Sequence, residues 1–222
     1  MVELAPLSRF PFLAELSAGG ASRLLAATRH VTLPPQTKVI EQGDEVSGVY
    51  LVEAGSLRVY YISSEGREGT LYWIDAGQSC ILALNCLFSR LTYPAWVETD
   101  QVETRVAIVS GDAYRELYLV EPALQRFTFE TLTTRLFELM TLIEETSSLG
   151  LEQRAAALLL RRSGDGQVLE TTHELLAHHL GSSREVVSRV LRNIARSGVI
   201  RLSPRSITIV DAARLRSLFD PS

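Results

Sequence analysis

Cysteine is scarce in this sequence, and it has no long run of apolar residues. The 222 residues include only two cysteines, which excludes the disulfide-dense scaffolds of small secreted proteins. No segment offers the roughly 20 consecutive apolar residues that a membrane-spanning helix needs. The opening residues, Met1-Val2-Glu3, lack the basic start of a signal peptide. We therefore expect a cytoplasmic protein without a membrane partner.

Sequence signatures of common enzymes are also missing. The chain has no Gly-x-Ser-x-Gly nucleophile elbow, no Walker phosphate loop and no His-Glu-x-x-His zinc motif. Its hydrophobic fraction of 46% is nevertheless high enough for real cores. The sequence thus predicts a folded protein that is not an enzyme.

Charge is divided unevenly along the chain. Residues 149–222 hold 11 arginines, no lysine and 7 acidic residues, a net charge of +4. Residues 1–148 hold 11 basic and 19 acidic residues, which is −8, and the two parts sum to −4. This asymmetry is typical of a nucleic-acid-binding part joined to a part that stays off phosphates. Because every cation of the basic part is an arginine, bidentate contacts are favoured over diffuse charge.

The stretch from residue 171 to residue 194 predicts two short helices around a tight turn. Thr171 with Glu174, and Ser182 with Glu185, have the spacing of capping boxes, and Gly181 suits the turn between them. Apolar residues at helical spacing predict the buried face of the second helix: Val187, Val190, Leu191 and Ile194. Its other face is polar and basic, which is typical of the recognition helix of a helix-turn-helix.

Two short β-rich runs follow, at residues 199–202 and 207–210, and they predict a hairpin, or wing. The run SSREVVSRVL at residues 182–191, followed by this wing, resembles the C-terminal domain of the CRP/FNR family of bacterial transcription regulators. The resemblance implies double-stranded DNA as a partner. A regulator of this family can also contact RNA polymerase.

The family's base contacts fall on the exposed face of the second predicted helix. The residues expected to read bases are Arg184, Glu185, Ser188 and Arg189. Arginine can bind guanine bidentately, and glutamate can accept a hydrogen bond from cytosine. The residues expected to contact DNA phosphates are Thr171, Ser183 and Arg205.

Short β-rich runs alternate with glycine turns between residues 38 and 109, which predicts an antiparallel sandwich or barrel. Before them, residues 1–30 predict two short helices separated by Gly19-Gly20. Gln42-Gly43-Asp44, followed by YLV at residues 50–52 and by Gly55, resembles the cyclic-nucleotide-binding β-roll of the same family.

A helix is predicted from Tyr114 to about Ser148. Beyond Pro122, its apolar residues alternate three and four apart, as in an a/d seam: Phe129, Leu132, Leu136, Leu139 and Ile143. The family dimerises through this helix, so we expect a homodimer. Helix-turn-helix dimers read palindromic operators, whose half-sites lie about one helical turn or a multiple of it apart.

These patterns together predict an α+β fold in three parts. Residues 1–120 would form a cyclic-nucleotide-binding-like β-roll that acts as the sensor. Residues 121–148 would form the long dimerisation helix. Residues 149–222 would form a winged helix-turn-helix that binds DNA.

The cassette that holds a cyclic nucleotide in the family has lost its key residues here. In that branch of the family a glutamate holds the ribose and an arginine pairs with the cyclic phosphate. This chain has Leu82-Ala83 and Tyr93-Pro94 at those places, and Arg90 comes several residues too early. Burying a phosphate without an arginine is costly. We therefore expect no useful affinity for cyclic AMP.

The cassette corresponds to residues 77–95 of this chain. Both cysteines, Cys80 and Cys86, lie in it among apolar residues. One interpretation is a sensor of redox state or reactive sulfur species, in which the two thiols close a disulfide or a polysulfide bridge, or of a soft metal, which the two thiols would ligate. A second is that both are small buried hydrophobic residues, with the β-roll binding a small organic ligand. A third is haem, for which Cys80, Cys86 and His30 are the candidate ligands in the sensor domain.

Overall fold

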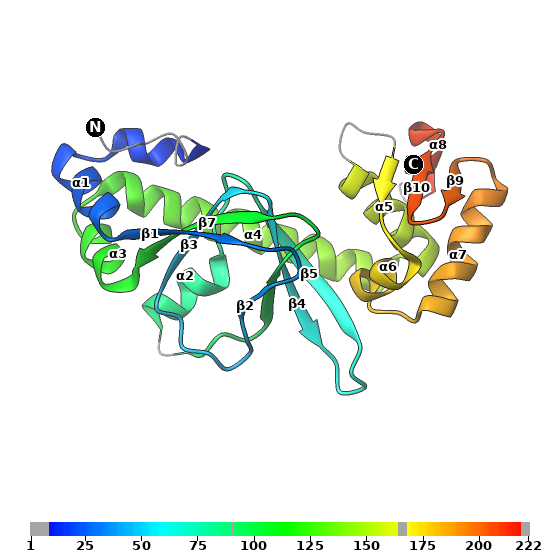
Figure 1. Ribbon diagram of the computed structural model, residues 1–222, viewed down its shortest axis with the longest axis horizontal. Helices are drawn as coiled ribbons and strands as arrows, with labels where there is room; N and C mark the ends of the chain where they lie inside the picture. Colours follow the sequence, from blue (N-terminus) through cyan, green and yellow to red (C-terminus); the bar gives the residue numbers. More distant parts are fainter. Residues whose placement is uncertain (1–8, 90, 164–167, 219–222) are drawn as a thin grey trace. The chain divides into compact units, whose positions relative to one another are not determined.

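The computed structural model of the chain describes residues 9–89, 91–163 and 168–218. The chain divides into two compact units (Figure 1). The first comprises the chain up to Tyr61 together with Leu71–Leu139. The second comprises Ile62–Thr70 and the chain from Met140. The division falls inside the long helix α4, which runs over Pro122–Ser148.

Two sheets form the β-roll of the first unit. One has the order β1-β7-β3, with strands at Thr28–Leu33, Thr104–Ser110 and Gly48–Ala54. The other has the order β2-β6-β4-β5, with strands at Lys38–Ile40, Trp96–Thr99, Ser56–Ile62 and Glu68–Asp75. The strands predicted between residues 38 and 109 are confirmed. Strand β1 was not predicted, and its first residues fall in the stretch, residues 1–30, for which helices were expected.

Strands β3 and β7 are buried on both faces. Tyr50 and Val52 of β3 join a core that also contains both cysteines, whereas Val49 and Leu51 join a second core. Successive side chains of a strand point to opposite faces, so a strand between two cores must be apolar at every position. The second core is closed by helices: η2 (Pro11–Glu15), α1 (Ala18–Ala26), α3 (Gly111–Tyr118) and the start of α4.

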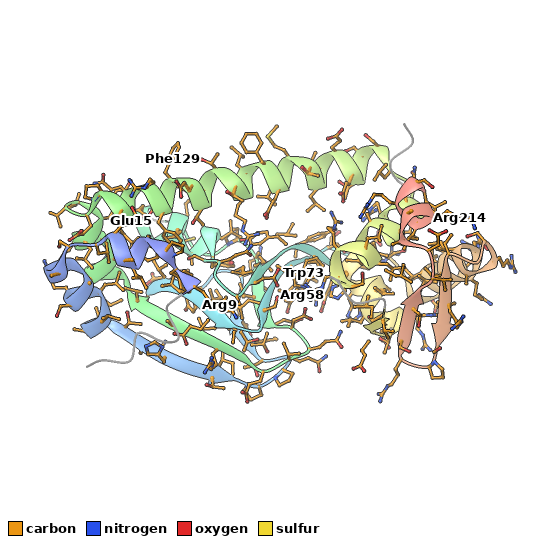
Figure 2. The ribbon with its side chains drawn as sticks, turned by 90° about the horizontal axis from the view of Figure 1, so that it is seen from above. Arg9, Glu15, Arg58, Trp73, Phe129 and Arg214 are labelled. Carbon is orange, nitrogen blue, oxygen red and sulfur yellow. The ribbon has the colours of Figure 1, made fainter. Side chains whose placement is uncertain are left out.

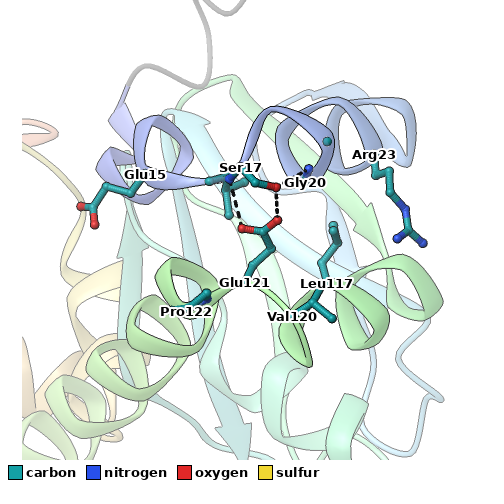
Figure 3. A pocket seen from close by; sticks show the side chains of 10 residues that line it. Glu15, Ser17, Gly20, Arg23, Leu117, Val120, Glu121 and Pro122 are labelled. Atoms are coloured by element: carbon teal, nitrogen blue, oxygen red, sulfur yellow. Dashed lines mark hydrogen bonds between the residues drawn. The ribbon is translucent and has the colours of Figure 1, made fainter.

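The start of α1 is held by a carboxylate from the α3–α4 turn. Glu121 accepts hydrogen bonds from the backbone N–H of Ser17, at 3.1 Å, and from its hydroxyl (Figure 3). The same hydroxyl accepts a hydrogen bond from Gly20 N and so caps α1. These bonds lower the pKa of the Glu121 carboxyl, so their contribution is lost as the pH falls through that lowered pKa. The clamp lines a surface hollow of about 670 Å³.

Replacing Gly20 by alanine is expected to lower stability, whereas replacing Gly19 is expected to raise it. A Cβ on Gly20 would lie 2.1 Å from Glu121 Oε1 and would push the carboxylate off Ser17. A Cβ on Gly19 meets nothing within 4 Å, so that variant gains helix propensity, about 0.5–1 kcal/mol. Thermal unfolding of both variants checks this. Equal midpoints would contradict the clamp.

The part of the second unit that follows α4 is a winged helix-turn-helix. Its helices are α5 (Leu151–Ser163), α6 (His173–Leu180), α7 (Arg184–Arg196) and α8 (Ala212–Ser217). Its sheet has the order β8-β10-β9, with strands at Val168–Glu170, Ser206–Ile209 and Ile200–Ser203. The predicted wing is confirmed, and β8 adds a third strand that was not predicted. Gly181 ends α6 in the left-handed conformation, with a φ of 63°.

Candidate nucleic-acid interface and thiol site

Helix α7 has one face in the core of its unit and one in solvent. Its buried residues are Val187, Leu191 and Ile194. Its N-cap is Ser183, whose hydroxyl accepts a hydrogen bond from Val186 N at 3.4 Å. Arg184, Glu185 and Arg189 are exposed. They lie where a helix inserted in the major groove would meet base edges.

Ser188 differs from the three exposed residues. Its hydroxyl lies 2.8 Å from His173 Nδ1 of α6, and its carbonyl accepts a hydrogen bond from Arg192 Nε at 3.1 Å. Partial burial lowers the pKa of His173, and Arg184 and Arg192 lower it further, so the imidazole is neutral at physiological pH. Ser188 therefore ties α7 to α6, a contact that the sequence did not reveal.

A hollow of about 350 Å³ lies between the start of α6 and the wing. Thr172, not Thr171, caps α6, with its hydroxyl 3.1 Å from Leu175 N. Thr171 is buried, and its backbone N–H donates to the carbonyl of Arg205 at 3.0 Å. Arg205 itself is exposed at the wing turn and has a φ of 59°. The hollow thus has hydroxyl and guanidinium groups at its rim, which are donors suited to a phosphate.

Helix α4 carries an exposed apolar stripe. Figure 2 shows Phe129 pointing outward from the helix, and 69% of this residue is exposed. The exposed residues that share its spacing of three or four form what we call the α4 stripe: Phe129, Leu132, Leu136, Met140 and Ile143. Leu139 of the predicted seam packs instead against the core that contains the cysteines. Met140 takes its place on the exposed face.

Both cysteines are buried beside helix α2, which runs over Ile81–Phe88. Cys80 and Cys86 are 1% and 8% exposed and belong to the same core. Cys80 stands at the first turn, because its carbonyl accepts a hydrogen bond from Leu84 N at 3.1 Å. Burial raises the pKa of both thiols. In this conformation both cysteines are therefore protonated and shielded.

Three side chains that the sequence did not single out as site residues surround Cys80. The Tyr93 hydroxyl lies 3.2 Å from Cys80 Sγ. The Tyr72 hydroxyl is buried nearby and lacks a hydrogen-bond partner of normal geometry. Arg135 reaches in from α4, donates to Gln78 Oε1 and lies 5.1 Å from the Tyr72 ring centre. Its charge and the Tyr93 hydrogen bond oppose the effect of burial on the pKa of Cys80.

The remaining candidate ligands lie elsewhere or are not described. His30 is on β1, and its Nδ1 lies 2.9 Å from a carboxylate oxygen of Glu53. Arg90 lies outside the described residues. Within residues 9–89, 91–163 and 168–218, no three His, Cys, Asp or Glu side chains come together as a metal site. No helix in these same ranges is long and apolar enough to cross a membrane.

A β-roll, a long helix and a winged helix-turn-helix define a class of DNA-binding regulators. Residues 30–120 match the cyclic nucleotide-binding domain family, and residues 153–218 match the Crp-like helix-turn-helix domain family. The chain is 31% identical over 196 residues to the cyclic AMP receptor protein of Thermus thermophilus, covering 84% of this chain and 86% of that protein. The chain therefore belongs to the CRP/FNR family and is a DNA-binding transcription regulator.

Two further comparisons agree with this assignment. The cAMP-activated global transcriptional regulator CRP of Haemophilus influenzae is 25% identical over 188 residues, which cover 81% of this chain and 83% of that protein. A solved CRP/FNR-family structure from Eubacterium rectale superposes with a TM-score of 0.85 at 30% identity. That match covers 95% of this chain and 98% of the other.

Proposed function

We propose that the protein is a homodimeric regulator that reads a palindromic operator through α7 and responds to thiol chemistry at Cys80 and Cys86. The observation that carries the DNA-reading part is the exposed polar face of α7 opposite its buried apolar face. Arg184, Glu185 and Arg189 would read bases. Ser188 would act by holding α7 against α6 through His173.

Phosphate contacts in this proposal come from the hollow between α6 and the wing and from the start of α7. Arg205 is exposed at its rim, and the hydroxyl of Ser183 stands at the start of α7. Because Thr171 is buried, the exposed Thr172 is the better candidate for the contact expected of Thr171. The α4 stripe supports a homodimer, since a contiguous apolar face on a helix is costly to leave in water.

The thiol part of the proposal rests on the cassette. An effector must favour one dimer geometry over another to change DNA binding. Arg135 belongs to α4 and bonds to Gln78, two residues before Cys80, so chemistry at Cys80 has a direct route to α4. Tyr93, which stands where the family's arginine would hold a cyclic phosphate, is fully buried against Cys80. The Arg135 guanidinium is already bonded to Gln78 and Glu138.

Cys80→Ser and Cys86→Ser are expected to abolish the response of DNA binding to thiol reagents. In the wild type, such reagents should change operator affinity by about 5-fold or more, the usual scale of coupling between two sites. The measurement is the affinity for an operator selected from random DNA, under reducing conditions and after thiol oxidation or persulfide treatment. Variants that respond like the wild type would rule out sensing by these cysteines.

A second candidate is a β-roll receptor for a small organic ligand or haem, in which the cysteines only pack the core. The burial and raised pKa of both thiols favour it. The relatives whose names include cyclic AMP suggest the first ligand to try. We expect no heat on titration of the purified protein with cyclic AMP. Tight binding there, together with unreactive thiols, would select the receptor over the thiol sensor.

A further inference from the structure

We propose that the cassette reacts with sulfane sulfur, supplied as a hydropersulfide or inorganic polysulfide, and that the product is a trisulfide between Cys80 and Cys86. This inference rests on the proposed thiol function and names its reagent class and product. It excludes a direct disulfide as the main product. Two independent observations carry it: the helical spacing of the two cysteines, and the polar groups buried around Cys80.

The spacing of the cysteines is set by α2. Leu84 N bonds to the carbonyl of Cys80, so Cys80 is the residue that caps α2, and its Cα stands at the start of the helical path that leads to Cys86. Six residues of helix advance about 9 Å and turn the second side chain about 120° away from the first. A disulfide requires its Cα atoms to lie within about 7 Å of each other. A direct bond would therefore unwind α2, whereas each inserted sulfur adds about 2 Å of reach.

The surroundings of Cys80 suit an added sulfur that carries negative charge. The Tyr93 hydroxyl lies 3.2 Å from Sγ and can donate to it. The Tyr72 hydroxyl is a second donor. Tyr72 is only 5% exposed, and its hydroxyl lacks a hydrogen-bond partner of normal geometry. The Arg135 guanidinium, with 6% of its side chain exposed, supplies positive charge beside them.

The reaction balances with the hydropersulfide as its only oxidant. In the first step a cysteine sulfur attacks the outer sulfur of the donor R–S–SH. One S–S bond forms, the donor's S–S bond breaks, and the leaving thiolate takes the cysteine proton as RSH. The same exchange converts the second cysteine to its hydropersulfide. The terminal sulfur of Cys80–S–S⁻ then attacks Sγ of Cys86, the S–S bond of the Cys86 hydropersulfide breaks, and HS⁻ leaves to become H₂S. Of the two sulfane sulfurs taken up, the one that leaves as H₂S is reduced, the other remains in the bridge, and the two cysteine sulfurs are oxidised.

The first exchange needs exposure of the thiols. Because both are buried in this conformation, α2 must open locally before they can react. Once α2 closes again, the three-sulfur bridge is compatible with its helical spacing. The added sulfur lies next to Arg135, so a displacement of that side chain would be passed to α4.

The test treats the reduced protein with glutathione hydropersulfide or with diamide, a thiol oxidant that supplies no sulfur. Mass spectrometry of peptides then identifies the bridge. We expect the hydropersulfide to add one sulfur and remove two hydrogens across Cys80 and Cys86, and diamide to give little intramolecular disulfide. Equal or faster disulfide formation with diamide, joined to a change in operator affinity, would overturn the trisulfide while leaving thiol sensing intact.

Variants separate the remaining outcomes. Cys80→Ser and Cys86→Ser should each stop at a hydropersulfide on the remaining cysteine. Tyr72→Phe should slow trisulfide formation by about tenfold, the scale of one hydrogen bond to a charged group, with the unfolding midpoint measured alongside. An unchanged rate in Tyr72→Phe would show that the buried Tyr72 hydroxyl does not stabilise the added sulfur. If no reagent changes operator affinity although the trisulfide forms, the proposed function fails and the chemistry stands.

Discussion

Arg189→Ala is expected to weaken operator binding by about 5- to 150-fold, or about 1–3 kcal/mol, and to relax specificity at one base position. The side chain is exposed on the face of α7 that is opposite the buried Val187 and Leu191. A bidentate contact to guanine is lost with the guanidinium, and the penalty falls on one base pair. Binding titrations with operators substituted at each position measure both effects.

Arg196→Ala is the matched control for this variant. Arg196 is the last residue of the same helix and is also exposed, but it lies far from the N-terminal turns that are expected to enter the groove. Its loss removes the same charge from the same unit and should not change base preference. An equal loss of affinity on every DNA sequence for Arg189→Ala would make that residue a phosphate contact. The salt dependence of binding would then fall by a slope of about 1.

Leu136→Glu is expected to give a monomer and to weaken operator binding by about 100-fold or more. The residue lies in the middle of the α4 stripe and is 58% exposed in the single chain. A glutamate there would be buried unpaired in a dimer, which is strongly unfavourable. A monomer binds one half-site and loses the gain of two linked contacts, which commonly reaches 10² to 10⁴.

Thr134→Glu serves as the control for the dimer prediction. Thr134 is exposed on the same helix but does not share the spacing of the stripe. That variant should remain a dimer and bind its operator normally. Sedimentation at several protein concentrations gives the state of both variants, and operator titrations follow. A Leu136→Glu protein that stays dimeric would place the interface on another surface.

Helices and strands with a strong hydrophobic periodicity could be predicted from the sequence, whereas those with a weak periodicity could not. Strand β3 is buried at every position but its last, and helix α7 has one buried face and one exposed face, so both have uninterrupted patterns. Strand β1 escaped prediction because it is an edge strand without a fully buried residue, and Arg29, His30 and Thr32 are exposed. Gly19 and Gly20, expected to separate two helices, lie inside α1, where only Gly20 is required to lack a Cβ by the Glu121 clamp.

The helix caps were predicted one residue early in both helices of the DNA-binding pair. Thr171 precedes Thr172, and Ser182 precedes Ser183, so each candidate cap is one of two adjacent hydroxyl residues. Spacing to the following glutamate favours the first of each pair. The chain enters α6 with the backbone of Thr171 bonded to the wing at Arg205, so Thr172 is left to cap the helix. Only the tertiary contact distinguishes them.

Part of the thiol site could be predicted from neighbouring residues in the sequence, and part depends on a contact that only the fold creates. The cassette and its two cysteines are neighbours in sequence, and their burial follows from the apolar residues around them. Arg135 is remote in sequence and reaches Gln78 and Tyr72 only because α4 lies against the roll. No pattern within the cassette indicates such a partner. A lone arginine directly beside an apolar seam was the one available signal.

The α4 stripe also bears on how the protein would respond to its own abundance. A regulator that must dimerise before it binds its operator occupies few operators while its concentration lies below the dissociation constant of the dimer. In that range occupancy rises with the square of the number of chains, so modest changes in synthesis would switch target genes sharply. The exposed leucines, methionine and phenylalanine of one helix would thus set a threshold for gene dosage.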